Sequence, residues 1–272
     1  MSDADIRARR DLLPELSRAA RAIAMPLFET GVDARNKAPD TDFPGAYDPV
    51  TEADTESERV LRAVIHDHFP DDAIEGEELP DVDGTSGYRW TLDPIDGTRG
   101  FISGVPVWST LIAVSREGDP VLGAIDLPAL GRMAVGDNDA AELRWDTGRV
   151  EPLRVRTVQT LSEARLACTQ PFGMFGPGEL AAYKIIQSGC ALSRLGLDAL
   201  AYVLLAQGRM DLVIEAGMKP CDVRALMPVV RGAGGVITDW EGGSPADGPR
   251  LVACGSPRLM DELYTYLGRA MG

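Results

Sequence analysis

Two aspartates, Asp93 and Asp96, stand three positions apart in the stretch 90–104, and Pro94 lies between them. Proline fixes its own φ angle and lacks an N–H, so the apolar strand before it is predicted to end at Asp93, where the chain turns. A turn of this kind directs both carboxylates and the carbonyl of Ile95 toward one point. Converging oxygens are what a hard divalent cation such as Mg²⁺ requires, so this stretch is a candidate metal site.

Gly97 and Thr98 follow the second aspartate directly and are predicted to begin a short helix. Gly97 lets the backbone come close to a ligand, and N–H groups at a helix start are suited to phosphate. Metal and phosphate in one turn indicate phosphoryl chemistry. Asp-Pro and Asp-Gly are also ordinary turn dipeptides, and the spacing of the two aspartates alone is more often structural. The choice between these interpretations depends on whether other carboxylates fit the same site.

Four further acidic residues are candidates to complete such a site, and each also has a structural interpretation. Asp54 stands three residues after Thr51, a predicted helix N-cap, where it is also a favourable first-turn charge. Glu77 belongs to a Gly-Glu-Glu run that would usually be a solvated loop. Asp222 lies in the first turn of a predicted helix, where an acid complements the helix dipole. Glu215 ends an apolar strand, a position from which acids often reach into a cleft.

The overall composition argues against several classes of protein. With 272 residues, 44% of them hydrophobic and 25% charged, the chain is long enough for one large domain or two joined ones. A formal net charge of −15 argues against binding to nucleic acid or to an anionic membrane. The four cysteines stand far apart without a CxxC pair, which favours reduced, mostly buried thiols. Because no signal core or membrane-length apolar run is visible, a cytoplasmic location is expected.

The first half is predicted to combine two amphipathic helices with an antiparallel sheet. The helices are expected at 4–29 and 51–68. Between them lies a polar loop, 33–47, whose Lys37 is either solvated or close to the substrate or metal. Short alternating runs predict the strands of a meander at 107–115, 121–126 and 132–135.

The second half alternates strands with helices, which is typical of an α/β layer. Strands are predicted at 164–168, 191–195, 212–215, 235–238 and 251–253. Helices are predicted at 179–187, 198–207, 222–233 and 258–269. The polar stretch 137–151 is interpreted as a loop and as a domain boundary. It would separate a metal- and phosphate-binding domain at 1–150 from a domain at 151–272 that completes the active site.

Three motifs together resemble the inositol monophosphatase superfamily. They are Gly76-Glu77-Glu78, Asp93-Pro94-Ile95-Asp96-Gly97-Thr98, and Asp222 ahead of an Ala-Gly-Gly segment. Their order and spacing match the family over nearly the whole chain. The resemblance implies a Mg²⁺-dependent, lithium-sensitive phosphomonoesterase of the α/β class. It also implies a layered αβαβα, sugar-phosphatase-like fold with an α+β N-terminal half containing the antiparallel sheet and an α/β C-terminal half.

Within this superfamily the chain is more similar to bacterial histidinol-phosphatases, on the stretches 93–104, 215–220 and 235–242. Two positions differ from the usual pattern, and both would lie near the substrate. Cys221 stands where an aromatic residue is usual, and 195–198 lacks the usual Gly-Asp form. The implied reaction is hydrolysis of histidinol phosphate to histidinol, in histidine biosynthesis. An inositol-1-monophosphatase, another polyol or sugar phosphatase, a 3′(2′),5′-bisphosphate nucleotidase and a non-catalytic metal- or phosphate-binding protein remain alternatives.

The resemblance also assigns the metal ligands. One Mg²⁺ is expected on Glu77, Asp93 and the carbonyl of Ile95, and a second on Asp93, Asp96 and Asp222. Oxygen-only ligands suit Mg²⁺, which keeps several waters and shares the phosphate oxygens. Two ions a few ångströms apart polarise the phosphate and activate the water that attacks it.

Catalysis is assigned by the resemblance to Glu77, Thr98 and Asp54. Thr98, oriented by Asp54, and Glu77 are expected to position and deprotonate the attacking water. A third, weaker ion is expected near Glu77 and Asp54. The chain offers no Ser/His/Asp or Cys/His arrangement suited to a covalent route.

Substrate binding is expected at Gly97 and Thr98, whose N–H groups would hold the phosphate. Recognition beyond the phosphate is assigned to Glu215 and Asp198, with Arg194 as a further candidate. An acidic pair suits a small phosphate monoester that carries an ammonium group, as histidinol phosphate does, and also accepts the hydroxyls of a sugar or inositol. A homodimer is expected by analogy with the family.

Overall fold

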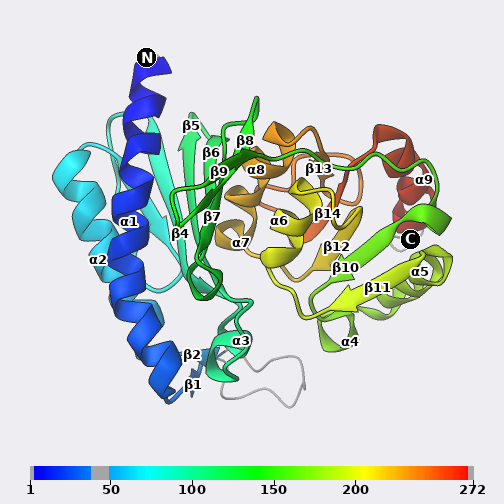
Figure 1. Ribbon diagram of the computed structural model, residues 1–272, viewed down its shortest axis with the longest axis horizontal. Helices are drawn as coiled ribbons and strands as arrows, with labels where there is room; N and C mark the ends of the chain where they lie inside the picture. The colour runs from blue at the N-terminus through cyan, green and yellow to red at the C-terminus, as the bar shows by residue number, and fades with distance from the viewer. Residues whose placement is uncertain (1–2, 38–48, 269–272) are drawn as a thin grey trace.

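Residues 3–37 and 49–268 are described by a computed structural model, and their helices and strands stack in five layers (Figure 1). Helices α1 (Asp3–Thr30) and α2 (Glu52–His68) cover the outer face of a seven-stranded sheet. A helical layer separates this sheet from a second, five-stranded sheet, whose far side carries further helices. The layered αβαβα fold that we predicted is therefore confirmed.

The seven-stranded sheet begins with a parallel pair and continues as an antiparallel meander. Its strands follow chain order: β3 (Ala73–Gly76), β4 (Tyr88–Asp96), β5 (Ser109–Arg116), β6 (Asp119–Leu127), β7 (Arg132–Gly136), β8 (Ala141–Trp145) and β9 (Val150–Pro152). The predicted meander is confirmed. The loop predicted over 137–151 is wrong, because β8 and β9 form a hairpin that extends the sheet. On β8 only Ala141 and Leu143 are buried, so its apolar face was too narrow to stand out among the polar residues.

Strand β4 continues through Pro94 to Asp96, so the predicted strand end at Asp93 is wrong. The register between β4 and β5 shifts between Asp93 and Asp96, and such a bulge is one of the few places where a strand accepts a proline. The hydroxyl of Thr110 on β5 donates to the Pro94 carbonyl over 2.8 Å. A paired strand therefore holds the two aspartates.

Two local features, the helix start after Asp96 and the capping box of Thr51 and Asp54, form as predicted. Helix α3 (Thr98–Ile102) begins directly after β4, with Gly97 at its start. Gly97 has a left-handed φ of 79°, and a Cβ there would lie 3.0 Å from the side chain of Asp198. In α2, Thr51 is the N-cap and Asp54 completes a capping box.

Two predictions fall partly outside the described residues. Residues 38–47 of the predicted loop at 33–47 lie there. Within the described part of that loop, β1 (Arg35–Asn36) is a short strand that pairs with β2 (Pro49–Val50). The last residue of the predicted helix 258–269 also lies there, and the rest of that helix forms as α9 (Pro257–Leu267).

The five-stranded sheet has the order β11-β10-β12-β14-β13 and mixes parallel with antiparallel pairs. Its strands are β10 (Arg165–Cys168), β11 (Leu192–Leu195), β12 (Leu212–Ala216), β13 (Val236–Thr238) and β14 (Arg250–Cys254). The helices of this half are α4 (Pro171–Met174), α5 (Pro177–Gly189), α6 (Leu200–Ala206), α7 (Pro220–Arg224) and α8 (Leu226–Gly232). All five predicted strands are present. The helix predicted over 222–233 is divided at Ala225, because Pro228 has no N–H for the carbonyl of Arg224.

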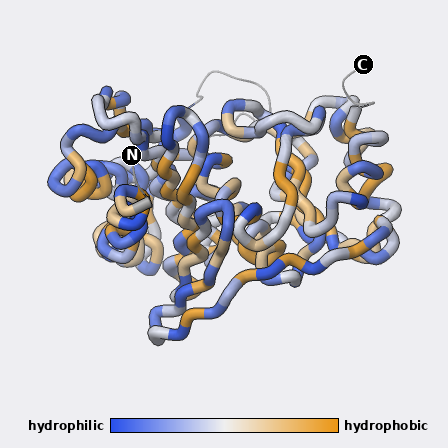
Figure 2. The backbone as a smooth tube through the Cα atoms, turned by 90° about the horizontal axis from the view of Figure 1, so that it is seen from above, coloured by the Kyte–Doolittle hydropathy of each residue, from blue (hydrophilic) through white to orange (hydrophobic). Residues whose placement is uncertain are grey.

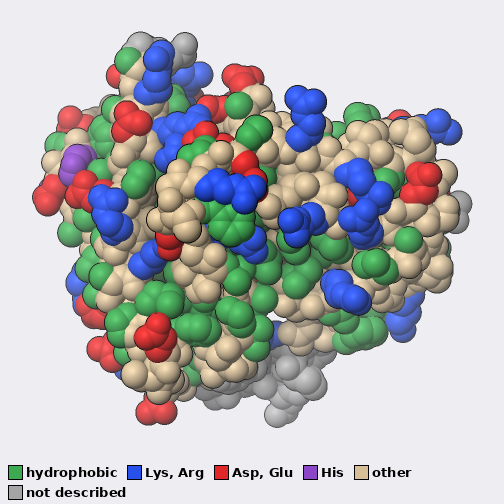
Figure 3. All heavy atoms as spheres, viewed as in Figure 1, with side chains coloured by type: hydrophobic (Ala, Val, Ile, Leu, Met, Phe, Trp, Pro, Cys, Tyr) green, Lys and Arg blue, Asp and Glu red, His purple; other side chains and the backbone are tan. Residues whose placement is uncertain are grey.

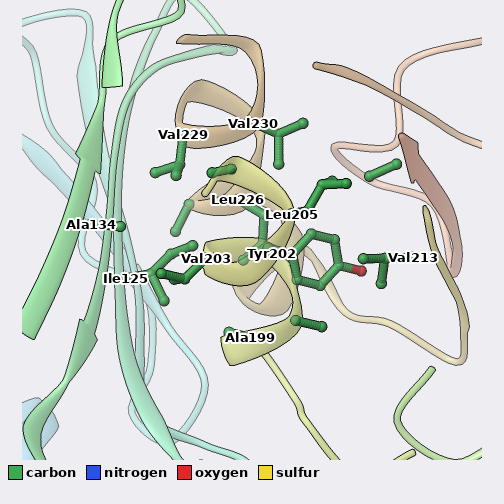
Figure 4. Packing of buried hydrophobic residues seen from close by; sticks show 14 of the residues in the cluster. Ile125, Ala134, Ala199, Tyr202, Val203, Leu205, Val213, Leu226, Val229 and Val230 are labelled. Atoms are coloured by element: carbon green, nitrogen blue, oxygen red, sulfur yellow. The ribbon is translucent and has the colours of Figure 1, made fainter. Parts of the chain in front are cut away.

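The largest hydrophobic cluster lies between the two sheets and draws on both halves of the chain. In Figure 4, Ile125 of the seven-stranded sheet and Val213 of the five-stranded sheet lie on opposite sides of Val203 and Leu226 from the helical layer. Burying one such side chain contributes about 1.5–3 kcal/mol. Figure 2 shows apolar segments running through the interior and hydrophilic segments in the outer loops. The domain boundary between residues 150 and 151 stays a prediction.

The distribution of charged side chains on the surface bears on which partners the protein can bind. On the face seen in Figure 3, basic side chains are interspersed with acidic and apolar ones and form no continuous patch among the described residues.

All four cysteines are free thiols, as predicted, and three of them are buried. Within residues 3–37 and 49–268, none of the helices is both long enough and apolar enough to cross a membrane.

Candidate active site

A cavity of about 620 Å³ opens where β4 and α3 of the first half meet β12, α6 and α7 of the second. Nine residues that we predicted for the site line it: Glu77, Asp93, Ile95, Asp96, Gly97, Thr98, Asp198, Glu215 and Asp222. Asp54 lies behind the cavity wall, against Thr98. Arg194 does not line the cavity.

Asp93, Asp96 and Asp222 each bring a carboxylate oxygen to one point, with all three oxygens within 4.8 Å of one another. Asp96 is held by the hydroxyl of Ser109, at 3.0 Å, and by the backbone N–H of Ala199, at 3.1 Å. Burial raises the pKa of all three carboxyls. The charge of a neighbouring acid raises it further, first that of Glu77 for Asp93 and Asp222, and first that of Asp198 for Asp96. Such a group of repelling oxygens fits a divalent cation, which removes the repulsion.

Asp93 also belongs to a second candidate group, with Glu77 and the thiol of Cys221, in which the ligand atoms again lie within 4.8 Å. Burial, followed by the charge of Asp222, raises the pKa of the Cys221 thiol. A thiol is also a soft ligand, which suits Mg²⁺ poorly. Oxygen ligands remain at this point, as Mg²⁺ prefers. Asp93 is therefore the carboxylate common to both groups.

Two lysines lie against Glu77. Lys219 Nζ donates to Glu77 Oε1 at 2.9 Å, and Lys37 Nζ donates to the same oxygen at 3.0 Å and also to Glu78. Although burial opposes it, the two ammonium groups lower the pKa of Glu77. Lys37 was one of our candidates, with solvation as the alternative. Lys219 was not predicted for the site, although it lies in the stretch 215–220 that resembles histidinol-phosphatases.

Thr98 and Asp54 lie in contact, as the resemblance implied. The Thr98 hydroxyl is 3.3 Å from Asp54 Oδ1 and donates to the Ile95 carbonyl at 2.9 Å. The other carboxylate oxygen of Asp54 accepts from the Thr51 N–H at 2.8 Å and from its hydroxyl at 2.6 Å. Capping and site roles are therefore compatible, since each uses a different oxygen of Asp54.

Glu215 and Asp198, two acids of the second half, also line the cavity. Glu215 accepts from the backbone N–H of Thr169 at 2.8 Å and from its hydroxyl at 2.9 Å, and Cys168 Sγ lies 3.6 Å away. Burial raises the pKa of Glu215 to about 8. Burial also raises the pKa of Asp198, to about 6, against the opposing charge of Arg99. The two acids thus titrate on either side of neutral pH.

Arg194 lies elsewhere, contrary to our prediction. It stands on β11, the edge strand, where its exposed guanidinium donates to the Ser193 carbonyl at 3.1 Å. Arg99 lies in the cavity wall instead and donates to the side chain of Gln170, which joins the two halves. The sequence held a weak signal for Arg99, which directly follows Thr98, but none for Gln170.

The chain is similar to known proteins over most of its length. The profile of the inositol monophosphatase family matches residues 10–270. Bifunctional phosphatase IMPL2, chloroplastic, from Arabidopsis thaliana is 42% identical over 196 residues, which are 71% of this chain and 55% of the plant protein. A histidinol-phosphatase from Streptomyces coelicolor is 37% identical over 227 residues, which are 81% of this chain and 84% of that protein.

A solved structure extends the likeness to the whole fold. An inositol monophosphatase from Zymomonas mobilis superimposes with a TM-score of 0.81 at 32% identity, over 98% of this chain and 100% of that chain. The resemblance that we inferred from the motifs is thereby confirmed. The chain belongs to the inositol monophosphatase family and is a phosphoric monoester hydrolase.

Proposed function

We propose that the protein is a Mg²⁺-dependent phosphatase that hydrolyses histidinol phosphate to histidinol. The observation that carries the metal dependence is the group of Asp93, Asp96 and Asp222, with oxygens within 4.8 Å of one another. These residues would hold one ion, and Glu77, Asp93 and the carbonyl of Ile95 a second. When bound, the ions supply Lewis-acid polarisation of the phosphate and lower the pKa of the attacking water.

The residues around this group supply positioning and proton transfer. The Thr98 hydroxyl, in contact with Asp54, would orient the water for in-line attack. Glu77, which its lysine neighbours keep ionised, would accept the proton from that water. The N–H groups of Gly97 and Thr98, at the cavity wall, would bind the phosphate oxygens.

The preference for histidinol phosphate rests on Asp198 and Glu215, two acids that line the cavity. Above its pKa of about 6, Asp198 is ionised at neutral pH and would pair with an ammonium group. Glu215, whose pKa is about 8, would donate or accept a hydrogen bond according to its protonation state. Inositol phosphates or sugar phosphates are the second candidates, because carboxylates also bind hydroxyls.

We propose three further properties on the strength of family membership. The first is inhibition by lithium. The second is a role in histidine biosynthesis, carried out in the cytoplasm. The third is a homodimer, which is also supported by β11, whose outer edge pairs with no other strand of the described residues. Its Leu192 and Leu195 are 41% and 44% exposed, and a second copy of the chain would cover them.

A substrate panel tests the proposal. Phosphate release from histidinol phosphate, inositol 1-phosphate and 3′-phosphoadenosine 5′-phosphate is measured with Mg²⁺ and with EDTA. We expect Mg²⁺-dependent release in which kcat/KM for histidinol phosphate exceeds that for the other two by at least roughly tenfold, which corresponds to about 1.4 kcal/mol. Preference for inositol 1-phosphate would support the second candidate, and undiminished release in EDTA would refute the metal dependence.

A further inference from the structure

The side-chain hydroxyl of Tyr202 is buried, and its capacity to form hydrogen bonds is unsatisfied within the described part of the chain. The residue lies on α6 and is 1% exposed, and its ring points from the helical layer toward Val213 on β12 (Figure 4). Among the described residues, its hydroxyl oxygen has no hydrogen-bond partner. A buried donor without an acceptor destabilises the fold, so a protein seldom keeps one unless something else bonds to it.

The position of Tyr202 distinguishes it from another tyrosine of the same kind. Tyr183 is also fully buried with an unpartnered hydroxyl, but it packs edge-on against Phe175 on the outer side of the five-stranded sheet. Tyr183 does not line the cavity of the candidate active site, whereas Tyr202 does. Tyr202 therefore holds an unused donor beside a substrate cavity, where a ligand is expected to arrive.

The neighbours of Tyr202 in this cavity already have their own partners. Glu215 accepts hydrogen bonds from Thr169, and Asp96 accepts from Ser109 and Ala199. Burial, followed by the charges of Glu215 and Cys168, raises the pKa of Tyr202 well above its usual range, so the phenol keeps its proton. Tyr202 therefore adds a neutral O–H group, still without an acceptor, to a cavity lined by the carboxyl groups of Glu215 and Asp96.

We propose that Tyr202 is a specificity-determining residue whose hydroxyl donates a hydrogen bond to the leaving-group half of the substrate. Its acceptor would be a neutral nitrogen or a hydroxyl oxygen, as in an imidazole or a polyol. The inference rests on the proposed phosphatase function and deepens it, because it adds a neutral donor to the carboxyl groups of Glu215 and Asp198. A substrate that lacks such an acceptor would leave the hydroxyl unpaired and be disfavoured.

The experiment compares Tyr202→Phe with Tyr183→Phe, the matched control. For the best substrate of the panel, histidinol phosphate under the proposed function, Tyr202→Phe should lower kcat/KM roughly three- to tenfold. Phenyl phosphate, whose leaving group carries no acceptor besides the ester oxygen, should change less than about twofold. Tyr183→Phe should change neither substrate. Both variants should keep or raise the Tm, because each removes an unpaired hydroxyl.

A binding measurement separates failure of this inference from failure of the proposed function. Titration calorimetry of histidinol, which needs no turnover, should give a Kd that is roughly three- to tenfold weaker for Tyr202→Phe than for wild type. Equal losses on both phosphate esters, an unchanged histidinol affinity, or a lower Tm for Tyr202→Phe would each overturn the inference. A wild-type enzyme that binds histidinol through Tyr202 but releases no phosphate would instead overturn the proposed function.

Discussion

Replacing Asp93 by asparagine should show how far the Asp93 carboxylate destabilises the metal-free protein and how far it contributes to stabilisation by Mg²⁺. Asp93 is shared by both candidate metal groups, and its Oδ1 accepts the backbone N–H of Ile95 at 3.1 Å. Asparagine retains an acceptor oxygen for that hydrogen bond but removes the negative charge. The variant should therefore be more stable than wild type without metal and should gain little from Mg²⁺.

The size of both effects follows from the geometry. Two unit charges 4 Å apart repel by about 4 kcal/mol at an effective dielectric constant of 20, and proton uptake already relieves part of this. We therefore expect Asp93→Asn to gain on the order of 1–3 kcal/mol in EDTA at pH 8. Mg²⁺ at 100 times its Kd should stabilise wild type by about 2.7 kcal/mol. For a chain of this size, 1 kcal/mol corresponds to roughly 2–4 °C in Tm.

Thermal unfolding in EDTA and in Mg²⁺ measures both quantities on the same protein. Asp72→Asn is the matched control, because Asp72 is a buried carboxylate bonded to Arg9, Ser86 and Trp90, away from the cavity. It should lose on the order of 3 kcal/mol in both buffers, since it leaves Arg9 unpaired, and should keep the full Mg²⁺ shift.

Two results would contradict this prediction. In the first, Asp93→Asn retains the Mg²⁺ shift in Tm of wild type. In the second, the variant melts below wild type in EDTA while Asp72→Asn behaves as expected. The first result would remove Asp93 from the metal site, and the second would show that the carboxylates do not repel one another in the metal-free protein.

Two further predictions concern single groups of the site. Thr98→Val, which removes the hydroxyl beside Asp54, should lower kcat by about 10²–10⁴ without changing the Mg²⁺ shift in Tm, and a Val variant within tenfold of wild type would contradict the role. Thr98→Ser keeps the hydroxyl and should retain most activity. The raised pKa of Glu215, about 8, means that its stabilising contribution is complete below about pH 4.5 and is lost as the pH rises through 8. In EDTA, urea unfolding of Glu215→Gln should show a stability less dependent on pH in this window, by up to about 1.4 kcal/mol per pH unit, and identical slopes would refute the shift.

Local patterns in the sequence were sufficient to predict many of the helices and strands. The period of apolar residues predicted the helices of the first half and all five strands of the second, because side-chain spacing directly reflects local backbone geometry. The capping box of Thr51 and Asp54 was predictable for the same reason. The predictions failed where pairing overrides local preference, as at Pro94, which a bulge accommodates within β4. They also failed at 137–151, where polar residues flank a narrow apolar face.

The sequence by itself determined the family and the metal-ligand candidates of this protein, since its motifs are short and contiguous. Only the tertiary structure decided which distant groups meet. It bonds Asp96 to the N–H of Ala199, places Lys219 on Glu77 and leaves Arg194 on an outer edge. These contacts depend on how two sheets pack across one helical layer, which no local spacing encodes. The aspartates that first suggested a turn are therefore fixed by a paired strand, and the second half completes their site.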